Sequence, residues 1–103
     1  YLNMDTEISF AEFDGYYKKV VAFLGDNWTS LNEDETMHML FILDNLKSNA
    51  EDRAKRKEKE AKKYAKMAQR SEIWAHALIK RLRDAGMKDE EISKRYEEIY
   101  EAV

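Results

Sequence analysis

The two histidines are the side chains with the most recognisable potential chemistry. His38 lies between Met37 and Met39, and imidazole and thioether groups can together bind soft metal ions. This single short cluster offers no fourth donor, so we interpret His38 as a packing or rim residue. His76 follows Glu72 by four residues, but the di-iron bundle motif is Glu-x-x-His repeated on facing helices. We therefore predict no metal site and no cofactor.

Other catalytic patterns are incomplete. The segment 26–30 has the polar character of a calcium-binding loop, but Trp28 stands at a ligand position and no glycine occupies the sixth position. The three glycines are isolated, so no glycine-rich phosphate loop is present. No serine lies in a recognisable nucleophile elbow. We therefore expect a protein that is not an enzyme.

Basic side chains are concentrated in the middle of the chain. Residues 51–70 hold nine bases and four acids, whereas residues 1–50 hold nine acids and three bases. Residues 71–103 hold six bases and eight acids, and the whole chain carries a net charge of -3. The candidate residues for binding a partner or a nucleic acid are Arg53, Lys55, Arg56, Lys59, Lys62, Lys63, Lys66 and Arg70.

Two interpretations of this basic segment stay open. A helix rich in Lys and Arg can follow phosphates, so the region 53–83 is a candidate nucleic-acid-binding helix. Interspersed carboxylates and the acidic net charge favour instead a solvated helix face that attracts an acidic protein. We prefer the protein partner and keep nucleic acid as the alternative.

The elements that must carry these residues are helical. The chain has no proline, and no glycine lies between Gly25 and Gly86, an interval filled with strong helix formers. The pattern predicts one long charged helix over about 33–85, which would extend ~80 Å. Ser48-Asn49-Ala50-Glu51 is a second capping-box pattern, so a break near Ser48 is the alternative. Such a break would fold the chain into a compact bundle of three or four helices.

Two shorter helices flank the long one. The first spans about 10–24, with a capping box at Ser9 and a predicted C-terminal cap at Gly25. The second spans about 89–102 and follows a turn at Gly86. Short loops favour antiparallel neighbours, so we predict an all-α helical hairpin or bundle that forms one domain over 1–103. A stripe of alanines would remain uncovered, either solvated or open to a second helix: Ala54, Ala61, Ala65 and Ala68.

Composition bounds the function. Charged residues make up 38% of the chain, which is typical of long or coiled helices and leaves only a modest core. There is no cysteine, no apolar run of about 20 residues, and the start Tyr1–Ser9 is unlike a signal peptide. We expect a cytoplasmic protein without membrane contact. We expect it to self-associate, with a dimer favoured, and to regulate, inhibit or scaffold another protein.

Overall fold

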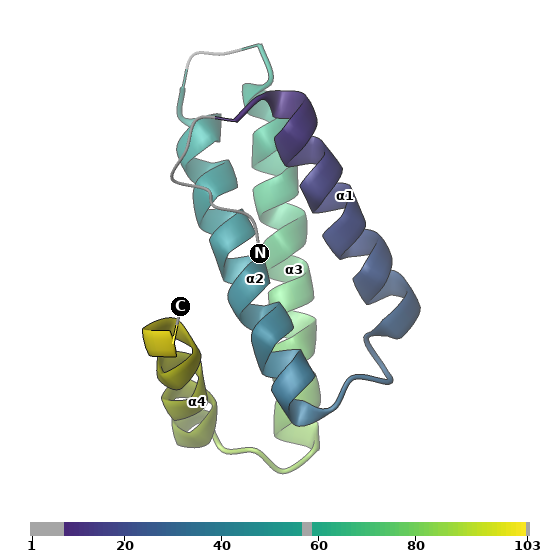
Figure 1. Ribbon diagram of the computed structural model, residues 1–103, viewed down its shortest axis with the longest axis vertical. Coiled ribbons are helices and arrows are strands. Elements are labelled where there is room, and N and C mark those ends of the chain that lie inside the picture. Colours follow the sequence, from purple (N-terminus) through teal and green to yellow (C-terminus); the bar gives the residue numbers. More distant parts are fainter. Residues whose placement is uncertain (1–7, 57–58, 103) are drawn as a thin grey trace.

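The computed structural model describes residues 8–56 and 59–102, and within them every regular element is an α-helix. The four helices are α1 (Phe10–Asn27), α2 (Glu33–Ala54), α3 (Ala61–Asp84) and α4 (Asp89–Ala102). α2 and α3 form an antiparallel hairpin, with α1 on one side of the pair and α4 on the other (Figure 1). The all-α prediction is confirmed, and so is the compact bundle that we gave as the alternative arrangement.

The prediction of one continuous helix over 33–85 was wrong. The chain leaves α2 at Ala54 and re-enters a helix at Ala61, so the break lies well after the predicted Ser48, which is an exposed residue inside α2. The longest extent of the molecule is 43 Å, about half the length of the expected rod. The ion pair between Lys47 Nζ and Glu72 Oε1, at 3.7 Å, shows the two halves side by side. Folding back is favoured because it lets two apolar seams bury each other.

Capping side chains define the starts of α1 and α2. The Ser9 hydroxyl accepts a hydrogen bond from the Glu12 N–H at 3.1 Å, as predicted. At the start of α2, Asn32 Oδ1 accepts from the Glu35 N–H at 2.8 Å, and Glu35 Oε1 accepts from the Asn32 N–H at 3.0 Å. Such reciprocal caps satisfy N–H groups that have no partner inside the helix.

Gly86 defines the end of α3. Gly86 has φ +98°, a left-handed conformation that favours glycine. The Met87 N–H donates to the Leu82 carbonyl and the Gly86 N–H to the Arg83 carbonyl, which is the Schellman pattern. The turn predicted at Gly86 is therefore confirmed. The cap predicted at Gly25 was wrong, because α1 continues through that residue to Asn27.

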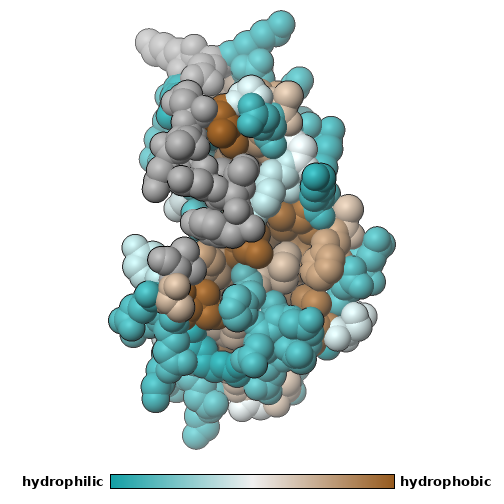
Figure 2. Space-filling model, viewed as in Figure 1, coloured by the Kyte–Doolittle hydropathy of each residue, from teal (hydrophilic) through white to brown (hydrophobic). Residues whose placement is uncertain are grey.

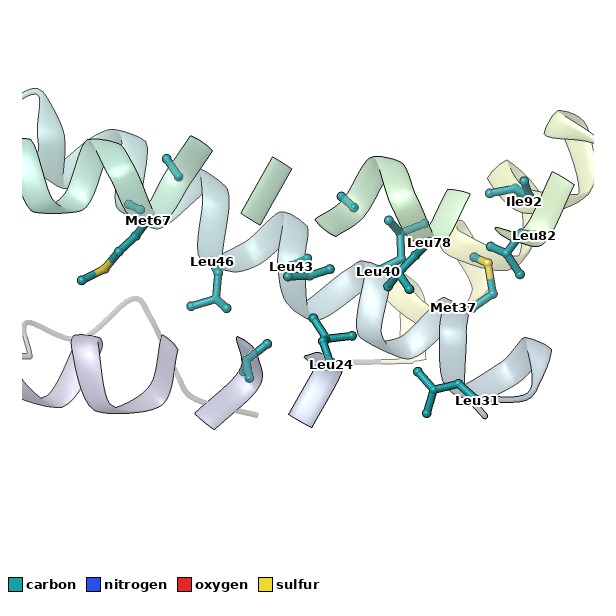
Figure 3. Close-up of a cluster of buried hydrophobic side chains, with 14 of the residues drawn as sticks. Leu24, Leu31, Met37, Leu40, Leu43, Leu46, Met67, Leu78, Leu82 and Ile92 are labelled. Carbon is teal, nitrogen blue, oxygen red and sulfur yellow. The ribbon is translucent and has the colours of Figure 1, made fainter. Parts of the chain in front are cut away.

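The hydrophobic core runs along the α2–α3 pair (Figure 3). Small buried residues, Ala50, Ala68, Ser71 and Ala75, let these two helices form the closest pair in the bundle. Of the alanine stripe that we expected to be uncovered, Ala68 is buried, Ala54 and Ala61 are half-buried, and Ala65 is exposed. Larger leucines and methionines fill the space on either side: Leu24, Met37, Leu40, Leu43, Leu46, Met67, Leu78 and Leu82.

Aromatic side chains attach α1 to the hairpin. The Phe13 and Tyr64 rings meet edge to face with centroids 5.2 Å apart, and the Trp28 and Trp74 rings do so at 6.1 Å. Such pairs stabilise by about 0.5–1.5 kcal/mol beyond their buried area. α1 is therefore held at both of its ends.

Ser71 is an exception within this core. It is fully buried, and its hydroxyl has no hydrogen-bond partner. By contrast, the hydroxyl of the buried Thr36 donates to the Asn32 carbonyl at 2.7 Å. An unsatisfied buried polar group costs about 1–3 kcal/mol. Ser71 is thus accommodated at the α2–α3 contact because its side chain is small, and its hydroxyl contributes nothing favourable there.

We expect Ser71→Ala to raise the free energy of unfolding by about 1–2 kcal/mol, because it removes the unsatisfied hydroxyl and adds a stronger helix former. Urea unfolding followed by circular dichroism measures the change. The matched control is Ala75→Ser, which places a hydroxyl one turn further along α3 and should destabilise by a similar amount. A Ser71→Ala protein less stable than the parent would contradict this account of the seam.

Candidate interaction surfaces

A groove lies between α2 and α4. After the Gly86 turn, α4 runs back along the first half of α2 (Figure 1). Its residues Ile92, Tyr96 and Ile99, at spacings of three and four, pack in or against the hydrophobic core. The Phe41 ring contacts those of Tyr96 and Tyr100, with centroids 5.7 and 6.3 Å apart. This α2–α4 groove has a volume of about 480 Å³. It is lined by Asp34, Met37, His38, Phe41, Ile42, Arg95, Glu98, Ile99 and Ala102.

A second groove of about 390 Å³ adjoins it on the α1 side of α2. Phe23, Leu31 and Met39 supply its apolar part, and it shares Asp34 and His38 with the α2–α4 groove. Phe23 is 44% exposed, which is unusual for a phenylalanine in a small bundle. Figure 2 shows apolar side chains gathered on this face of the molecule. The exposed face of α2 therefore carries apolar surface on both of its flanks.

The rim of the α2–α4 groove is acidic. Its one basic residue, Arg95, is already paired with Glu33 at 3.2 Å and with Asp34. Glu98 lines the same groove, and Glu35 lines the adjoining one. Carboxylates near the start of α2 are also favoured by the helix dipole. An incoming cation would therefore be attracted to this rim.

The contact between α4 and α2 leaves Tyr96 half-buried. Burial raises the pKa of Tyr96 well above its usual value, and the hydrogen bond and negative charge of Asp44 raise it further. The neutral phenol is thus the form that the packed helix pair accepts. Tyr96 lies outside the lining of the α2–α4 groove, near Asp44 and Tyr100, and its uncharged form favours the docking of α4.

The structure places most of the predicted basic residues at one end of the bundle, around the α2–α3 connection. Seven of the eight candidates are exposed. Lys63 Nζ lies 5.3 Å from the centre of the Phe10 ring. Burial raises the pKa of Tyr17, and the positive charge of Arg70 opposes this rise in part. In α3, Glu72 is the only acid between Ala61 and Arg83.

Arg53 is the eighth candidate, and it is buried. Only 5% of it is exposed, and its Nε has no hydrogen-bond partner. Its guanidinium carbon lies 5.0 Å from the centre of the Phe13 ring and 5.8 Å from that of Tyr64. Two aromatic faces and the C-terminal end of α2 stabilise this charge. Leu46, Ala50 and Arg53 share one face of α2, a spacing that could have identified Arg53 as a buried position.

Each histidine makes its nearest polar contact within its own helix. His38 Nδ1 lies 2.8 Å from the Asp34 carbonyl oxygen, a hydrogen bond within one helix turn. His76 Nε2 lies 3.9 Å from Glu72 Oε1, at an exposed site where Glu72 also meets Lys47. Among the described residues no three His, Cys, Asp or Glu side chains come together in a way that would hold a metal ion. None of the described helices has the length and apolar character that crossing a membrane requires.

Comparisons with protein-family models, with curated proteins and with solved structures give no match for this chain. Any functional assignment must therefore come from the surfaces themselves.

Arg53 allows a test of how this end of the bundle is stabilised. Removing an ion from water costs several kcal/mol, more than the roughly 0.5–2 kcal/mol that a cation gains from an aromatic face. We expect Arg53→Met to raise the free energy of unfolding by about 1–3 kcal/mol in urea titrations. Lys55→Met, at an exposed site two residues away, should change it by less than about 0.5 kcal/mol. A destabilised Arg53→Met protein would mean that the aromatic contacts outweigh the desolvation.

Proposed function

We propose that this protein is a non-enzymatic interaction protein that binds a basic amphipathic helix of another protein along the α2–α4 groove. Through that contact it would act as a regulatory, inhibitory or scaffolding accessory factor. The observation that carries the proposal is an open apolar groove with an acidic rim. Helix-in-groove recognition uses apolar anchors at i, i+3, i+4 and i+7 on one face of the bound helix.

The dimensions of the groove support a helical occupant. The α4 residues that line the groove lie between Arg95 and Ala102, and the facing α2 residues lie between Asp34 and Ile42, so each wall extends ~11 Å, about two helical turns. The apolar side chains of Phe41, Ile42 and Ile99 line the groove, and the half-buried Ile42 and Ile99 supply most of the surface that a ligand could cover. Burying one leucine-sized side chain contributes about 1.5–3 kcal/mol, and the cost of association takes away part of what three or four of them contribute. An affinity in the micromolar range is the expected scale.

The charge of the rim selects the kind of helix. Asp34 and Glu98 line the groove, and the positive charge of Arg95 is compensated by its two carboxylate partners. Lysines or arginines flanking the apolar stripe of a bound helix would meet these carboxylates. Electrostatic complementarity of this kind contributes more to specificity and association rate than to affinity. A helix with an acidic polar face would be disfavoured.

The test uses a synthetic probe, a fluorescein-labelled helix of about 18 residues with leucines on one face and lysines elsewhere. We expect it to bind with micromolar affinity in fluorescence anisotropy, and at least about tenfold more tightly than the same helix with glutamates for lysines. Ile42→Glu and Ile99→Glu should each weaken binding of the lysine helix by about tenfold or more.

Ile73→Glu is the matched control, because Ile73 is 58% exposed on α3 and lines neither groove. Thermal unfolding of each variant checks that α4 stays docked. Equal loss with Ile73→Glu, or no loss with the two groove variants, would contradict the proposal. A dimer that Ile42→Glu dissociates in light scattering would make a second copy of the chain the occupant.

The exposed basic residues favour nucleic acid as a second candidate. Lys55, Arg56, Lys59 and Lys63 lie at the same end of the bundle, and only one acid interrupts the bases of α3 up to Arg83. A surface of this kind binds phosphates without sequence preference and loses affinity steeply with salt. The apolar groove is not needed for such binding, so the two candidates can be separated.

For this candidate, a labelled 20-base-pair duplex or a 20-nucleotide RNA is titrated at several salt concentrations. Four phosphate contacts would give a log–log salt slope of about -4 for the duplex. Changing Lys55, Arg56, Lys59 and Lys63 together to glutamate should abolish binding. The control changes Lys18, Lys19, Lys88 and Lys94, which alters net charge equally at other sites. Equal loss in both variants would indicate a net-charge effect and contradict a localised site.

A further inference from the structure

In its described residues, 55–56 and 59–60, the connection between α2 and α3 lacks the stop signals that Asn32 and Gly86 supply elsewhere. Asn32 starts α2 with a capping box, and Gly86 ends α3 with a positive φ. At the end of α2, by contrast, Lys55 stays in the right-handed helical region with φ -76° and ψ -17°. Glu60, at the start of α3, makes no side-chain cap. Neither end is closed by a residue that prevents the helix from continuing.

The sequence of the connection favours helix. Residues 55–60 read Lys-Arg-Lys-Glu-Lys-Glu, all strong helix formers, with neither glycine nor proline. The first turn of α3 holds Lys62 and Lys63 and no acid, so its charges oppose the helix dipole. A helix running from α2 into α3 would remove both helix ends and this conflict. The chain is kept folded back by the burial of apolar side chains between α2 and α3, because the local sequence of the connection favours a continuous helix.

That burial can be provided by another molecule of the same chain. We propose that this protein forms a dimer by exchange of helices, in which α2 and α3 of each chain straighten into one long helix. Two such helices pair antiparallel, so that α3 of one copy packs on α2 of the other through the same small seam residues, Ala50, Ala68, Ser71 and Ala75. Exchange of identical elements requires no new contact surface.

Electrostatics opposes this dimer at low salt. The antiparallel pairing brings the basic segments of two copies together at the centre, including Lys55, Arg56 and Lys59 of each chain. Repulsion between exposed charges is screened over about 10 Å at 0.1 M ionic strength. The exchanged dimer is therefore strengthened by salt. Binding of a basic helix in the α2–α4 groove is weakened by salt, so the two associations are distinguishable, and this inference does not depend on the proposed function.

The first test is a matched pair of variants in the connection. Arg56→Ala/Glu60→Ala and Arg56→Gly/Glu60→Gly remove the same two side chains and leave the net charge unchanged. Two alanines in place of two glycines favour a continuous helix about 30-fold per chain, and about 1,000-fold for the two chains of a dimer. Light scattering on a sizing column should show a dimer for the alanine variant, increasing with protein concentration and with salt. The glycine variant should stay monomeric.

The second test measures the shape of the dimer. Spin labels at positions 47 and 72 are adjacent in the hairpin, where the native side chains approach to 3.7 Å. In one straight helix they are 25 residues and ~37 Å apart. A labelled chain diluted tenfold with unlabelled chain reports only the distance within one molecule. The dimer fraction should give the long distance and the monomer fraction the short one.

Three outcomes would overturn the proposal. One is an alanine variant that stays monomeric up to millimolar concentration and in 1 M salt. Another is a dimer equally abundant in the alanine and glycine variants. The third is a dimer whose labels at 47 and 72 stay adjacent within each chain, which would place the contact on an outer surface. Ile42→Glu, which tests the groove, should leave the exchanged dimer intact.

Discussion

Close contact between α2 and α3 is made possible by small side chains, and the other elements take their positions from this pair. Ala50, Ala68, Ser71 and Ala75 are all nearly or fully buried. Dispersion contacts are individually weak but numerous when two helices approach closely. Because the pair is fixed, α1 can attach through aromatic contacts to α3, and α4 can attach through Phe41 on α2. Both grooves are spaces left between these attached helices and α2.

The features of the fold that depend on neighbouring residues could be predicted from the sequence. The caps at Ser9 and Asn32 and the turn at Gly86 rest on side chains within one or two turns of each other. The α2–α3 connection could not be predicted in this way, because its residues favour helix and no local signal ends it. Its position is set by two seams meeting across the hairpin, and that contact is far away in the sequence. The capping-box pattern at Ser48 was misleading, because such a pattern can also occur inside a continuous helix such as α2.

The candidate surfaces were predictable to different degrees. The clustering of basic residues followed from counting charges, and the structure places seven of the eight at exposed sites. The burial of Arg53 was not predicted, although helical spacing places it on the same face of α2 as the buried Leu46 and Ala50. The α2–α4 groove had no comparable signal. Met37 and Ile99 are 62 positions apart, and only the path of α4 after Gly86 brings them into one site.

The arrangement of charge follows from the same hairpin. In an extended helix the bases of residues 53–66 would be distributed along ~20 Å, with acids of the flanking segments at either side. Folding back at residues 55–60 concentrates those bases at one end and leaves the carboxylates of Glu33, Asp34 and Asp89 at the other. Concentrating like charge costs free energy, so the apolar seam must outweigh both this repulsion and the helical preference of the connection. A second molecule that covered the same apolar surface would shift that balance toward the open chain. An anion that bound the basic end of one copy would reduce the repulsion there and shift the balance toward the hairpin.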